Sequence, residues 1–236
     1  EGVCEALKAR ARQHAVTLSV LIQTVWAVVL GALNGGRRDV VFGIVASGRP
    51  AELPDIDRAV GLFIQSLPVR VRWQDGDRLA GMLARLKPQS QDQMRYGYLP
   101  LAELGKDLID HVIAFENYPL NSHYNGDAIE LFDVEGYEKG PYPLGISVTA
   151  RNVLDVRFHY DPVRLDREQV QDLGDRLAKL LLRVAEDDAA GAAALETLAA
   201  KRALVAAAPV AAPRPSESEP ETSAAAQRSS ADGAEV

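Results

Sequence analysis

The sequence contains one cysteine, Cys4, among its 236 residues. A single thiol cannot close an intrachain disulfide or supply a cysteine-based zinc site, so a disulfide-stapled secreted module and a zinc finger are both excluded. The helix predicted around Cys4 looks exposed, and no histidine lies beside it in the sequence, so the thiol is a poor candidate for a nucleophile. The sequence therefore offers no cysteine chemistry.

Positive charge and aromatic side chains are also scarce. The 26 lysines and arginines are outnumbered by 33 aspartates and glutamates, the formal net charge is -7, and aromatic residues make up 6% of the chain. A nucleic-acid-binding surface needs a concentration of Lys and Arg. We therefore expect no nucleic-acid partner.

Long hydrophobic runs are missing too. The most apolar stretch, residues 18–33, is interrupted by Ser19, Gln23 and Thr24. It is shorter than the roughly 20 apolar residues that a membrane span needs. The first residues show neither the basic nor the apolar region of a secretion signal. We therefore expect a cytoplasmic protein without a membrane partner.

Familiar catalytic motifs are absent from the sequence. It contains no HExxH, no Walker loop, no GxGxxG and no GxSxG. None of the four histidines has the spacing of a metal ligand, so no metal site is predicted. The nearest approach to a motif is the run from His123 to Asp127, an HxxxD that lacks a preceding histidine and a following glycine. We therefore predict no catalytic residue in this chain.

Two kinds of periodicity alternate along the chain and predict an α/β (α+β) fold. Apolar residues at helical spacing predict five helices: 2–14, 18–33, 79–86, 101–108 and 170–184. Short apolar or alternating runs predict six strands: 39–46, 61–73, 111–116, 129–136, 144–150 and 153–160. The last two strands are expected to form a hairpin.

Local signals refine these elements. Thr17, Asp77 and Asp166 can cap the helices that follow them. Pro88 is expected to kink or end the third helix, because proline lacks the N–H that the helix interior needs. Pro68 indicates an edge strand or a bulge for the same reason.

Two strands carry expectations about burial. The continuous apolar run at 39–46 predicts a strand covered on both faces. The strand 61–73 is expected to begin buried and to end half exposed, because apolar residues are continuous at its start and alternate with arginines at its end.

Composition divides the chain into three parts. Residues 1–188 hold the predicted helices and strands, and residues 189–208 form an Ala-rich connector that should be helical by propensity. Residues 209–236 contain no Leu, Ile, Phe, Tyr, Trp or Met. Such a segment cannot bury enough apolar surface to offset its ordering entropy, so we expect a disordered linker or tail.

Four phrases in a fixed order carry a family resemblance: residues 41–43 with 47–50, residues 60–70, residues 99–104 and residues 115–119. Together they resemble the C-terminal half of the condensation domain of nonribosomal peptide synthetases. The second phrase looks like the family's GxFxNTxPxR motif, and the fourth, FENYP, is typical of amide-forming members. The resemblance covers roughly residues 5–188.

The resemblance implies a chloramphenicol-acetyltransferase-like lobe with a mixed β-sheet flanked by helices. Complete family members have two such lobes, and the HHxxxDG motif of the N-terminal lobe is not found in this sequence. The chain should therefore be inactive alone and should form amide bonds only together with its missing N-lobe. The acyl or aminoacyl thioesters and the acceptor amine would arrive on phosphopantetheine arms, with no cofactor bound directly.

The same resemblance implies the partners and the site. The partners are the N-lobe, the acyl or peptidyl carrier domains and an adjacent adenylation domain. Ten residues should line the substrate tunnel between the lobes: Ser47, Gly48, Arg49, Gly61, Phe63, Gln65, Ser66, Glu116, Asn117 and Tyr118.

Each of these residues also has a structural interpretation. Gly48 and Gly61 could serve turn geometry, and Arg49 could anchor its loop through a salt bridge rather than contact a carrier phosphate. Gln65 is a polar residue in an apolar run, so it either lines a polar cavity or makes a structural hydrogen bond. The family usually has Asn-Thr where this sequence has Gln65 and Ser66, which moves the amide one methylene further out.

Two other functional hypotheses remain. The lobe could serve as a non-catalytic docking or scaffold piece of a megasynthase. It could also be a separate acyltransferase of the same superfamily that acts as an oligomer, but each subunit would then need its own catalytic histidine motif.

Overall fold

A five-stranded mixed sheet lies at the centre of the computed structural model, with the strand order β2-β1-β3-β4-β5. The structure describes residues 2–49, 53–56, 58–105, 108–116, 140–187 and 195–197. The strands are β1 (Asp39–Ser47), β2 (Ile64–Arg72), β3 (His111–Phe115), β4 (Leu144–Ala150) and β5 (Leu154–Tyr160). The predicted hairpin is confirmed, since β4 and β5 pair antiparallel, whereas the strand predicted at 129–136 lies outside the described residues.

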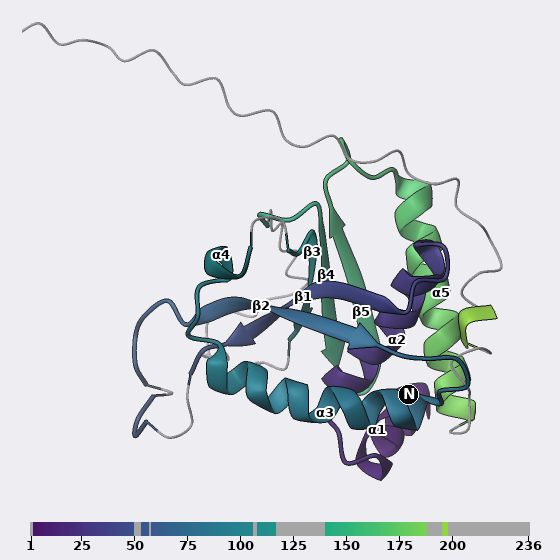
Figure 1. Ribbon diagram of the computed structural model, residues 1–236, viewed down its shortest axis with the longest axis horizontal. Helices are drawn as coiled ribbons and strands as arrows, with labels where there is room; N and C mark the ends of the chain where they lie inside the picture. Colours follow the sequence, from purple (N-terminus) through teal and green to yellow (C-terminus); the bar gives the residue numbers. More distant parts are fainter. Residues whose placement is uncertain are drawn as a thin grey trace, which may run out of the picture. The chain divides into compact units, whose positions relative to one another are not determined.

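Five helices accompany the sheet (Figure 1). They are α1 (Gly2–Gln13), α2 (Leu18–Leu33), α3 (Leu79–Tyr96), α4 (Leu101–Leu104) and α5 (Arg167–Glu186). The predicted class, a mixed sheet flanked by helices, is confirmed. The chain divides into compact units at residues 1–204 and 205–236, and every described residue belongs to the first. The predicted tail at 209–236 therefore lies outside the described residues.

The strand pairing brings several loops to one edge of the sheet. β1 runs antiparallel to β2 and parallel to β3, which in turn runs parallel to β4. The carboxyl ends of β1, β3 and β4 and the amino end of β2 therefore lie at the same edge. This edge carries most of the predicted tunnel residues that the structure describes.

The core lies between one face of the sheet and the helices. Helix α2 contacts α1, α3, α5 and β1, and its Trp26 is fully buried. The sheet contributes alternate side chains that are 4% exposed or less: Phe42, Val69, Ile113, Ile146 and Val148. Val41 and Val45 point to the other face and are only partly buried. On the helical face Ile44 and Ala46 are also only partly buried, so the predicted coverage of both faces of β1 holds only in part.

The helix caps follow the sequence at two of the three predicted positions. The hydroxyl of Thr17 accepts a hydrogen bond from the N–H of Val20 at 3.2 Å. Asp166 and Gln169 form a reciprocal capping box at the start of α5. Asp77 does not cap α3, which begins after Arg78. Instead its carboxylate accepts from the N–H of Gln74 at 2.7 Å and closes the preceding turn.

The sequence predicts that Pro88 kinks or ends the third helix; helix α3 continues past it to Tyr96, so the proline does not end the helix. The carbonyl that loses its partner belongs to Ala84, four residues earlier, and both Ala84 and Pro88 are exposed. Water can therefore pair with that carbonyl, which lowers the cost of proline in the helix. Helix α4, in contrast, is shorter than predicted and ends at Leu104.

Two burial predictions are also wrong. Cys4 is 2% exposed rather than on an exposed surface, because α1 packs against α5. Strand β2 begins exposed, with Ile64 at 62%, and its later residues Val69 and Val71 are buried. The start is therefore exposed rather than buried as predicted, whereas the predicted half-exposed end is confirmed, because exposed Arg70 and Arg72 alternate with the buried valines.

Among the described helices, none is alone long and apolar enough to cross a membrane. Helices α1 and α2 would reach that length and hydrophobicity only together, and they bend by 99° at the break between them.

Candidate functional site

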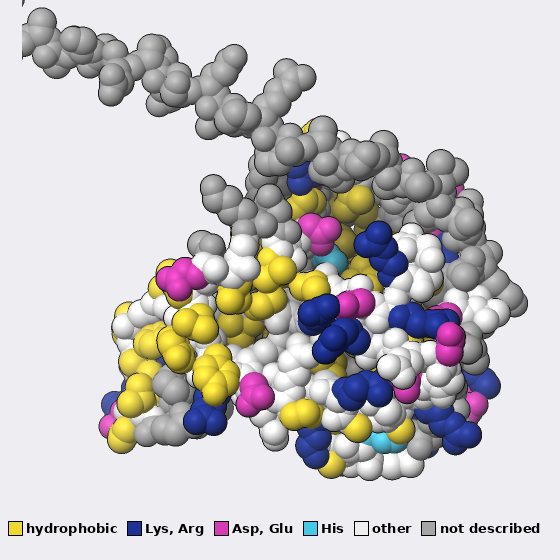
Figure 2. All heavy atoms as spheres, in the orientation of Figure 1, with side chains coloured by type: hydrophobic (Ala, Val, Ile, Leu, Met, Phe, Trp, Pro, Cys, Tyr) yellow, Lys and Arg dark blue, Asp and Glu magenta, His cyan; other side chains and the backbone are white. Residues whose placement is uncertain are grey.

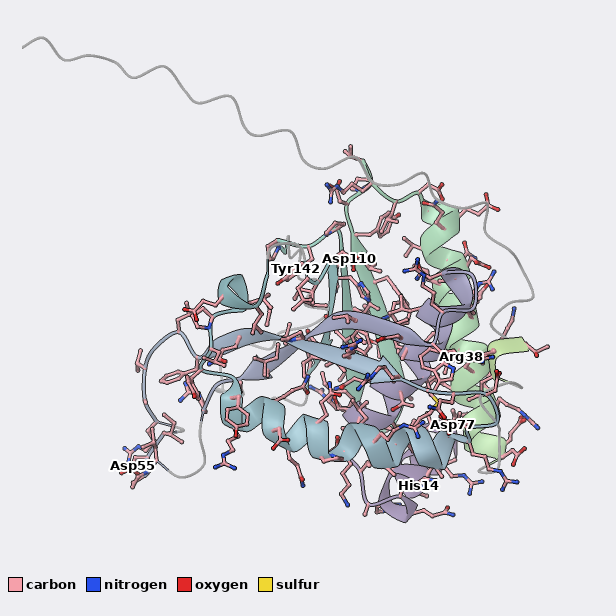
Figure 3. The ribbon with its side chains drawn as sticks, viewed as in Figure 1. His14, Arg38, Asp55, Asp77, Asp110 and Tyr142 are labelled. Carbon is pink, nitrogen blue, oxygen red and sulfur yellow. The ribbon has the colours of Figure 1, made fainter. Side chains whose placement is uncertain are left out.

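Most of the predicted tunnel residues come together at the edge where β1 ends and β2 begins. Ser47 ends β1 and is followed by Gly48 and Arg49. In the antiparallel register Ser66 lies opposite Val45. Figure 3 shows the connecting loop, marked by Asp55, at the opposite end of β2 from Arg38. Glu116 reaches the same edge from β3, where its N–H donates to the carbonyl of Val148 at 2.8 Å. Asn117 and Tyr118 lie outside the described residues.

The pleat separates these residues onto two faces of the sheet. Because side chains alternate along a strand, Ser47, Ser66 and Glu116 point to the face opposite the helices. Gln65 points to the helical face, in line with the buried Leu67. The structure therefore brings three of the predicted side chains onto one surface and turns Gln65 away from it.

Arg49 anchors the loop that follows β1. Its guanidinium donates to the carbonyl of Ile56 and, at 3.0 Å, to the carbonyl of Ala59. It also lies 4.3 Å from the centre of the Phe63 ring. The predicted loop-anchoring role is therefore supported, but carbonyl oxygens and an aromatic ring take the place of the predicted salt bridge. Phe63 is half buried beneath this arginine rather than in the main core.

Replacing Arg49 with Ala should loosen the loop without unfolding the lobe. Two hydrogen bonds to a charged group and a cation–π contact are lost, which should raise amide exchange at Arg58 and Ala59 by about tenfold or more. Hydrogen exchange measured by mass spectrometry tests this. Arg58→Ala is the matched control, because that side chain is exposed in the same loop. Equal exchange in the Arg49 and Arg58 variants would contradict the anchoring role.

Gly48 sits where the chain has no room for a side chain. Its N–H donates to the carbonyl of Phe63 at 2.7 Å. A Cβ on Gly48 would come 2.7 Å from that same carbonyl and closer still to the amide of Gln65. Gly61 is exposed, and a Cβ there would meet only the Phe63 ring, at 3.1 Å. The close approach of the Phe63 backbone therefore explains why a glycine stands at position 48. No comparable backbone contact explains the glycine at position 61.

The Gln65 amide occupies the space that two glycines leave free. It is half buried beside Gly48, and a Cβ on Gly97 would lie 3.0 Å from its Oε1. Both glycines thus shape the pocket around the amide. This packing accounts for the position of the side chain, and a role in catalysis stays a prediction.

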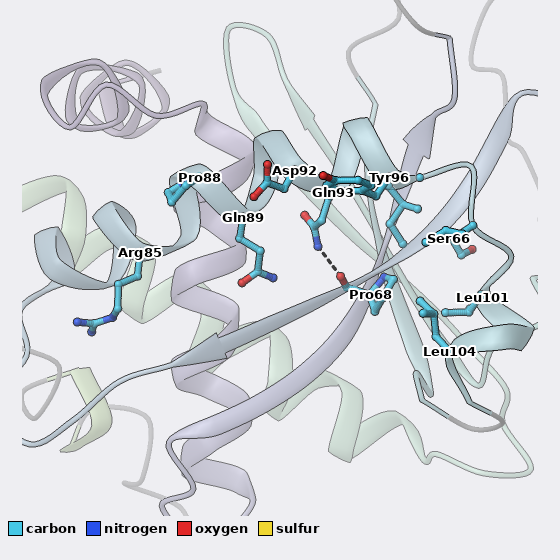
Figure 4. Close-up of a pocket in the computed structure, with 13 residues that line it drawn as sticks. Ser66, Pro68, Arg85, Pro88, Gln89, Asp92, Gln93, Tyr96, Leu101 and Leu104 are labelled. Carbon is cyan, nitrogen blue, oxygen red and sulfur yellow. Dashed lines mark hydrogen bonds between the residues drawn. The ribbon is translucent and has the colours of Figure 1, made fainter.

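A groove opens next to this edge, between β2, the C-terminal part of α3 and α4 (Figure 4). Its volume is about 490 Å³. Ser66 and Pro68 supply the β2 side, and Leu101 and Leu104 supply the α4 side. Ser66 is therefore the predicted tunnel residue that also borders a cavity.

Exposed apolar side chains surround this end of the lobe. Figure 2 shows them gathered on the side of the molecule that carries the β1–β2 loop and α4. Val60 and Leu62 are essentially fully exposed, at 102% and 95%, and Tyr98 is 73% exposed. A concentration of exposed apolar side chains of this kind is typical of an interaction surface.

Sequence reasoning missed a buried polar cluster around His111. The indole N–H of Trp26 donates to His111 Nε2 at 2.9 Å, and His111 Nδ1 lies 2.5 Å from Asp110 Oδ1. The acceptor role of Nε2 places the ring proton on Nδ1. The hydrogen bond from His111 lowers the pKa of Asp110, whose side chain is largely exposed. Because both ring nitrogens have partners, His111 serves the core and is not available as a catalytic base.

A second missed cluster holds the connector on the lobe. Leu195 is fully buried, and the Glu196 carboxylate accepts two hydrogen bonds from Arg38, at 3.0 and 3.2 Å. It also accepts one from the Trp73 indole N–H at 2.6 Å. Burial alone would raise the pKa of Glu196, but the hydrogen bonds from Arg38 and Trp73 outweigh it and leave the pKa below the ordinary value.

Replacing Glu196 with Gln should destabilise the lobe by about 1 kcal/mol at pH 7, because the amide nitrogen that replaces one carboxylate oxygen cannot accept from Arg38 and the other contacts lose the charge of Glu196. A carboxylate with a lowered folded-state pKa stabilises the fold above its unfolded pKa and loses that contribution as the pH falls through the folded value. The difference between wild type and variant should therefore shrink below about pH 4.5. Urea unfolding across pH 7 to 4 tests this, and a constant difference would contradict it.

Comparison with known proteins identifies a single family. A family model described as "Condensation domain" matches residues 1–203. Tyrocidine synthase 2 from Brevibacillus parabrevis is 35% identical over 182 residues, which are 72% of this chain and 5% of that protein. Bacitracin synthase 3 from Bacillus licheniformis is 34% identical over 192 residues, 77% of this chain and 3% of that protein. The chain thus spans a small part of these relatives.

Solved structures agree on the fold. The first condensation domain of the calcium-dependent antibiotic synthetase, in complex with a substrate analogue, has a TM-score of 0.67 at 19% identity. The match covers 80% of this chain and 44% of that one. The X-domain from teicoplanin biosynthesis has a TM-score of 0.67 at 20% identity, covering 81% of this chain and 46% of that one.

Proposed function

Because the chain belongs to the condensation-domain family, we propose that it is the C-terminal lobe of such a domain and forms amide bonds together with an N-terminal lobe. The observation that carries this proposal is the edge where β1, β2 and β3 meet. It gathers predicted tunnel residues beside an exposed apolar surface. A complete solved domain of this fold is more than twice the length of the part matched here.

The lobe would act by positioning. In the proposed reaction, the amine of an acceptor attacks a thioester, the C–N bond forms, the C–S bond breaks, and the amine proton leaves. Holding two tethered substrates in reacting geometry can supply much of the rate enhancement. Ser47, Ser66 and Glu116 offer hydroxyl and carboxyl groups on the sheet face opposite the helices. A histidine of the N-terminal lobe would accept the proton that the amine loses.

The proposal includes the partners. The substrates would be delivered on phosphopantetheine arms by carrier domains, and this chain itself would bind no cofactor. An adenylation domain would follow on the same polypeptide, after the connector that Leu195 and Glu196 hold on the lobe. The carrier domains and the adenylation domain are proposed because the chain belongs to the condensation-domain family and spans a small part of its relatives.

The test uses the chain joined to its upstream lobe, with carrier-bound aminoacyl thioesters as substrates. Gln65→Leu removes the amide that packs beside Gly48 behind the site surface and should lower kcat by about tenfold, because the strand ends that position the substrates are no longer held in place. The unfolding free energy should change little. Val163→Ala is the control, because that side chain is 90% exposed. Unchanged kcat for Gln65→Leu would make Gln65 a structural residue.

The second candidate is a non-catalytic docking lobe. The exposed Val60, Leu62 and Tyr98 favour it, because they form an apolar surface without any catalytic histidine motif in the chain. If the joined enzyme binds carrier domains but transfers no acyl group, the docking function replaces the catalytic one.

A further inference from the structure

The side of β2 that does not pair with β1 has an unpaired backbone position beside the groove. One side of this strand pairs with β1, and the other side has no strand partner among the described residues. In an antiparallel pair, successive residues point their N–H and C=O alternately toward the partner and away from it. In the amide orientation that satisfies both groups, the Gln89 side chain accepts from the N–H of Arg70 at 3.0 Å and donates to its C=O at 2.8 Å. The even-numbered residues of β2 therefore point outward.

Helix α3 covers part of this edge with side chains four residues apart. Gln89 satisfies Arg70, and the Gln93 amide donates to the carbonyl of Pro68 (Figure 4). Pro68 has no N–H, so the buried Oε1 of Gln93 has no partner among the described atoms. The next position of the stripe is Gly97, which has no side chain to offer Ser66.

Three polar groups along this side of β2 and α3 therefore lack a partner. They are the N–H and C=O of Ser66 and the Oε1 of Gln93, and no described residue bonds to them. Two are acceptors and one is a donor. A peptide backbone supplies both donors and acceptors and can pair with the two groups of Ser66, whereas a purely apolar ligand would leave them unpaired.

The shape of the groove favours a single extended polypeptide segment as its occupant. It lies between α3 and α4, with Tyr96, Leu99, Leu101 and Leu104 in its walls. A volume near 490 Å³ is within the range of small-ligand pockets and suits a short extended segment. Residues of α3 and α4 line the groove beside β2, so the sheet edge of a second copy would contact these helices as well as the strand. Beyond Ser66, exposed Ile64 and Leu62 continue the apolar surface.

We propose that this groove takes an extended, apolar polypeptide segment of the same synthetase, from outside this chain, which adds as a strand along Ile64–Ser66 of β2. The pairing would stop at Pro68, where the N–H is missing and Gln93 already occupies the carbonyl. The synthetase as the source rests on the proposed function, because the matched part makes up only 44% to 46% of the solved relatives' chains. The unpaired backbone groups of β2 are present whatever reaction the chain takes part in.

A capped, soluble peptide, Ac-Lys-Val-Thr-Val-Thr-Lys-NH2, probes the site directly. It should bind the chain and slow hydrogen exchange at the Ser66 amide, while exchange at Arg70 stays slow with and without peptide because Gln89 already covers it. The same peptide with N-methylated valines lacks the two valine N–H donors, which lie on one edge of the extended peptide, and should bind at least tenfold more weakly. Equal binding of both peptides, or no binding of either, would overturn the edge-strand proposal.

Two variants locate the binding. Ser66→Pro removes only an outward N–H, as Pro68 already does, and should weaken peptide binding about tenfold. Ser66→Ala keeps that N–H and should bind like wild type. If Ser66→Pro fails to fold, the N-methylated peptide gives the same comparison. Peptide affinity that is equal in both folded variants would place the binding elsewhere.

The source of the segment is tested in the complete synthetase. The Ser66 amide should be protected there without added peptide, and Ser66→Ala should leave that protection unchanged. Fast exchange at Ser66 in an active synthetase would refute the added strand while leaving the condensation function standing. If the Ser66 amide is protected in a synthetase that forms no amide bonds, the added strand stands and the condensation function is refuted. Self-association of the chain that is lost with Ser66→Pro would identify a second copy as the occupant and overturn the proposal.

Discussion

Replacing Trp26 with Ala should lower the free energy of unfolding by about 3–5 kcal/mol, the largest loss expected from a single substitution in this lobe. The indole is fully buried in α2, and its ring centre lies 5.7 Å from that of His111 and 6.4 Å from that of Phe158. His111 in turn stacks on Phe42 at 6.0 Å. Truncation removes the apolar contacts and leaves a cavity where α2 meets the sheet.

Two milder variants separate the hydrogen bond from the packing. Trp26→Phe keeps most of the ring but leaves His111 Nε2 buried without a donor, which should cost about 1–3 kcal/mol. Combining it with His111→Phe removes both polar partners, so the double variant should lose less than the sum of the two single variants. Urea unfolding measures all three. Strict additivity would show that the Trp26–His111 hydrogen bond adds nothing to stability.

Replacing Gly48 with Val should destabilise the lobe by about 1–3 kcal/mol and should also displace the Gln65 amide. Even one added carbon would come 2.7 Å from the carbonyl of Phe63, which belongs to the backbone and cannot rotate away. Relief requires β1 and β2 to separate at the edge that carries the site residues. In the joined enzyme, kcat should therefore fall together with stability.

Gly61→Val is the matched control for Gly48. Gly61 is exposed in the same loop, and a Cβ at this position would meet only the Phe63 ring. Urea unfolding and acyl-transfer kinetics should show a small effect at position 61 and a large one at position 48. Similar effects at both positions would mean that the loop as a whole, rather than the close approach at Gly48, controls this edge.

Local sequence signals predicted several elements well. The bounds of α2 follow from Thr17, whose hydroxyl caps the helix, and from the apolar run that ends before Asn34. Helix α5 follows from the Asp166 capping box and its apolar stripe. Pro68 predicted an edge strand, and β2 lies at the edge. These features depend on contacts within a few residues, which a sequence displays directly.

Long-range contacts account for what the sequence did not show. Trp26 and His111 are 85 residues apart, and Trp73 and Glu196 are 123 apart. Gln89 and Gln93 resemble an ordinary solvated helix face, and only the position of β2 shows that they cover its edge. The apolar start of β2 could be a core strand or an interaction surface by sequence alone, and Ile64 is 62% exposed.

The central claim is that this chain is one lobe of a condensation domain and supplies the wall of a shared site. The direct test measures peptide bond formation between carrier-bound aminoacyl thioesters with the chain alone and with the upstream lobe added. The account predicts no product above the uncatalysed background for the chain alone and amide product when both lobes are present. Product from the chain alone would contradict it, because the reaction would then not need the missing lobe.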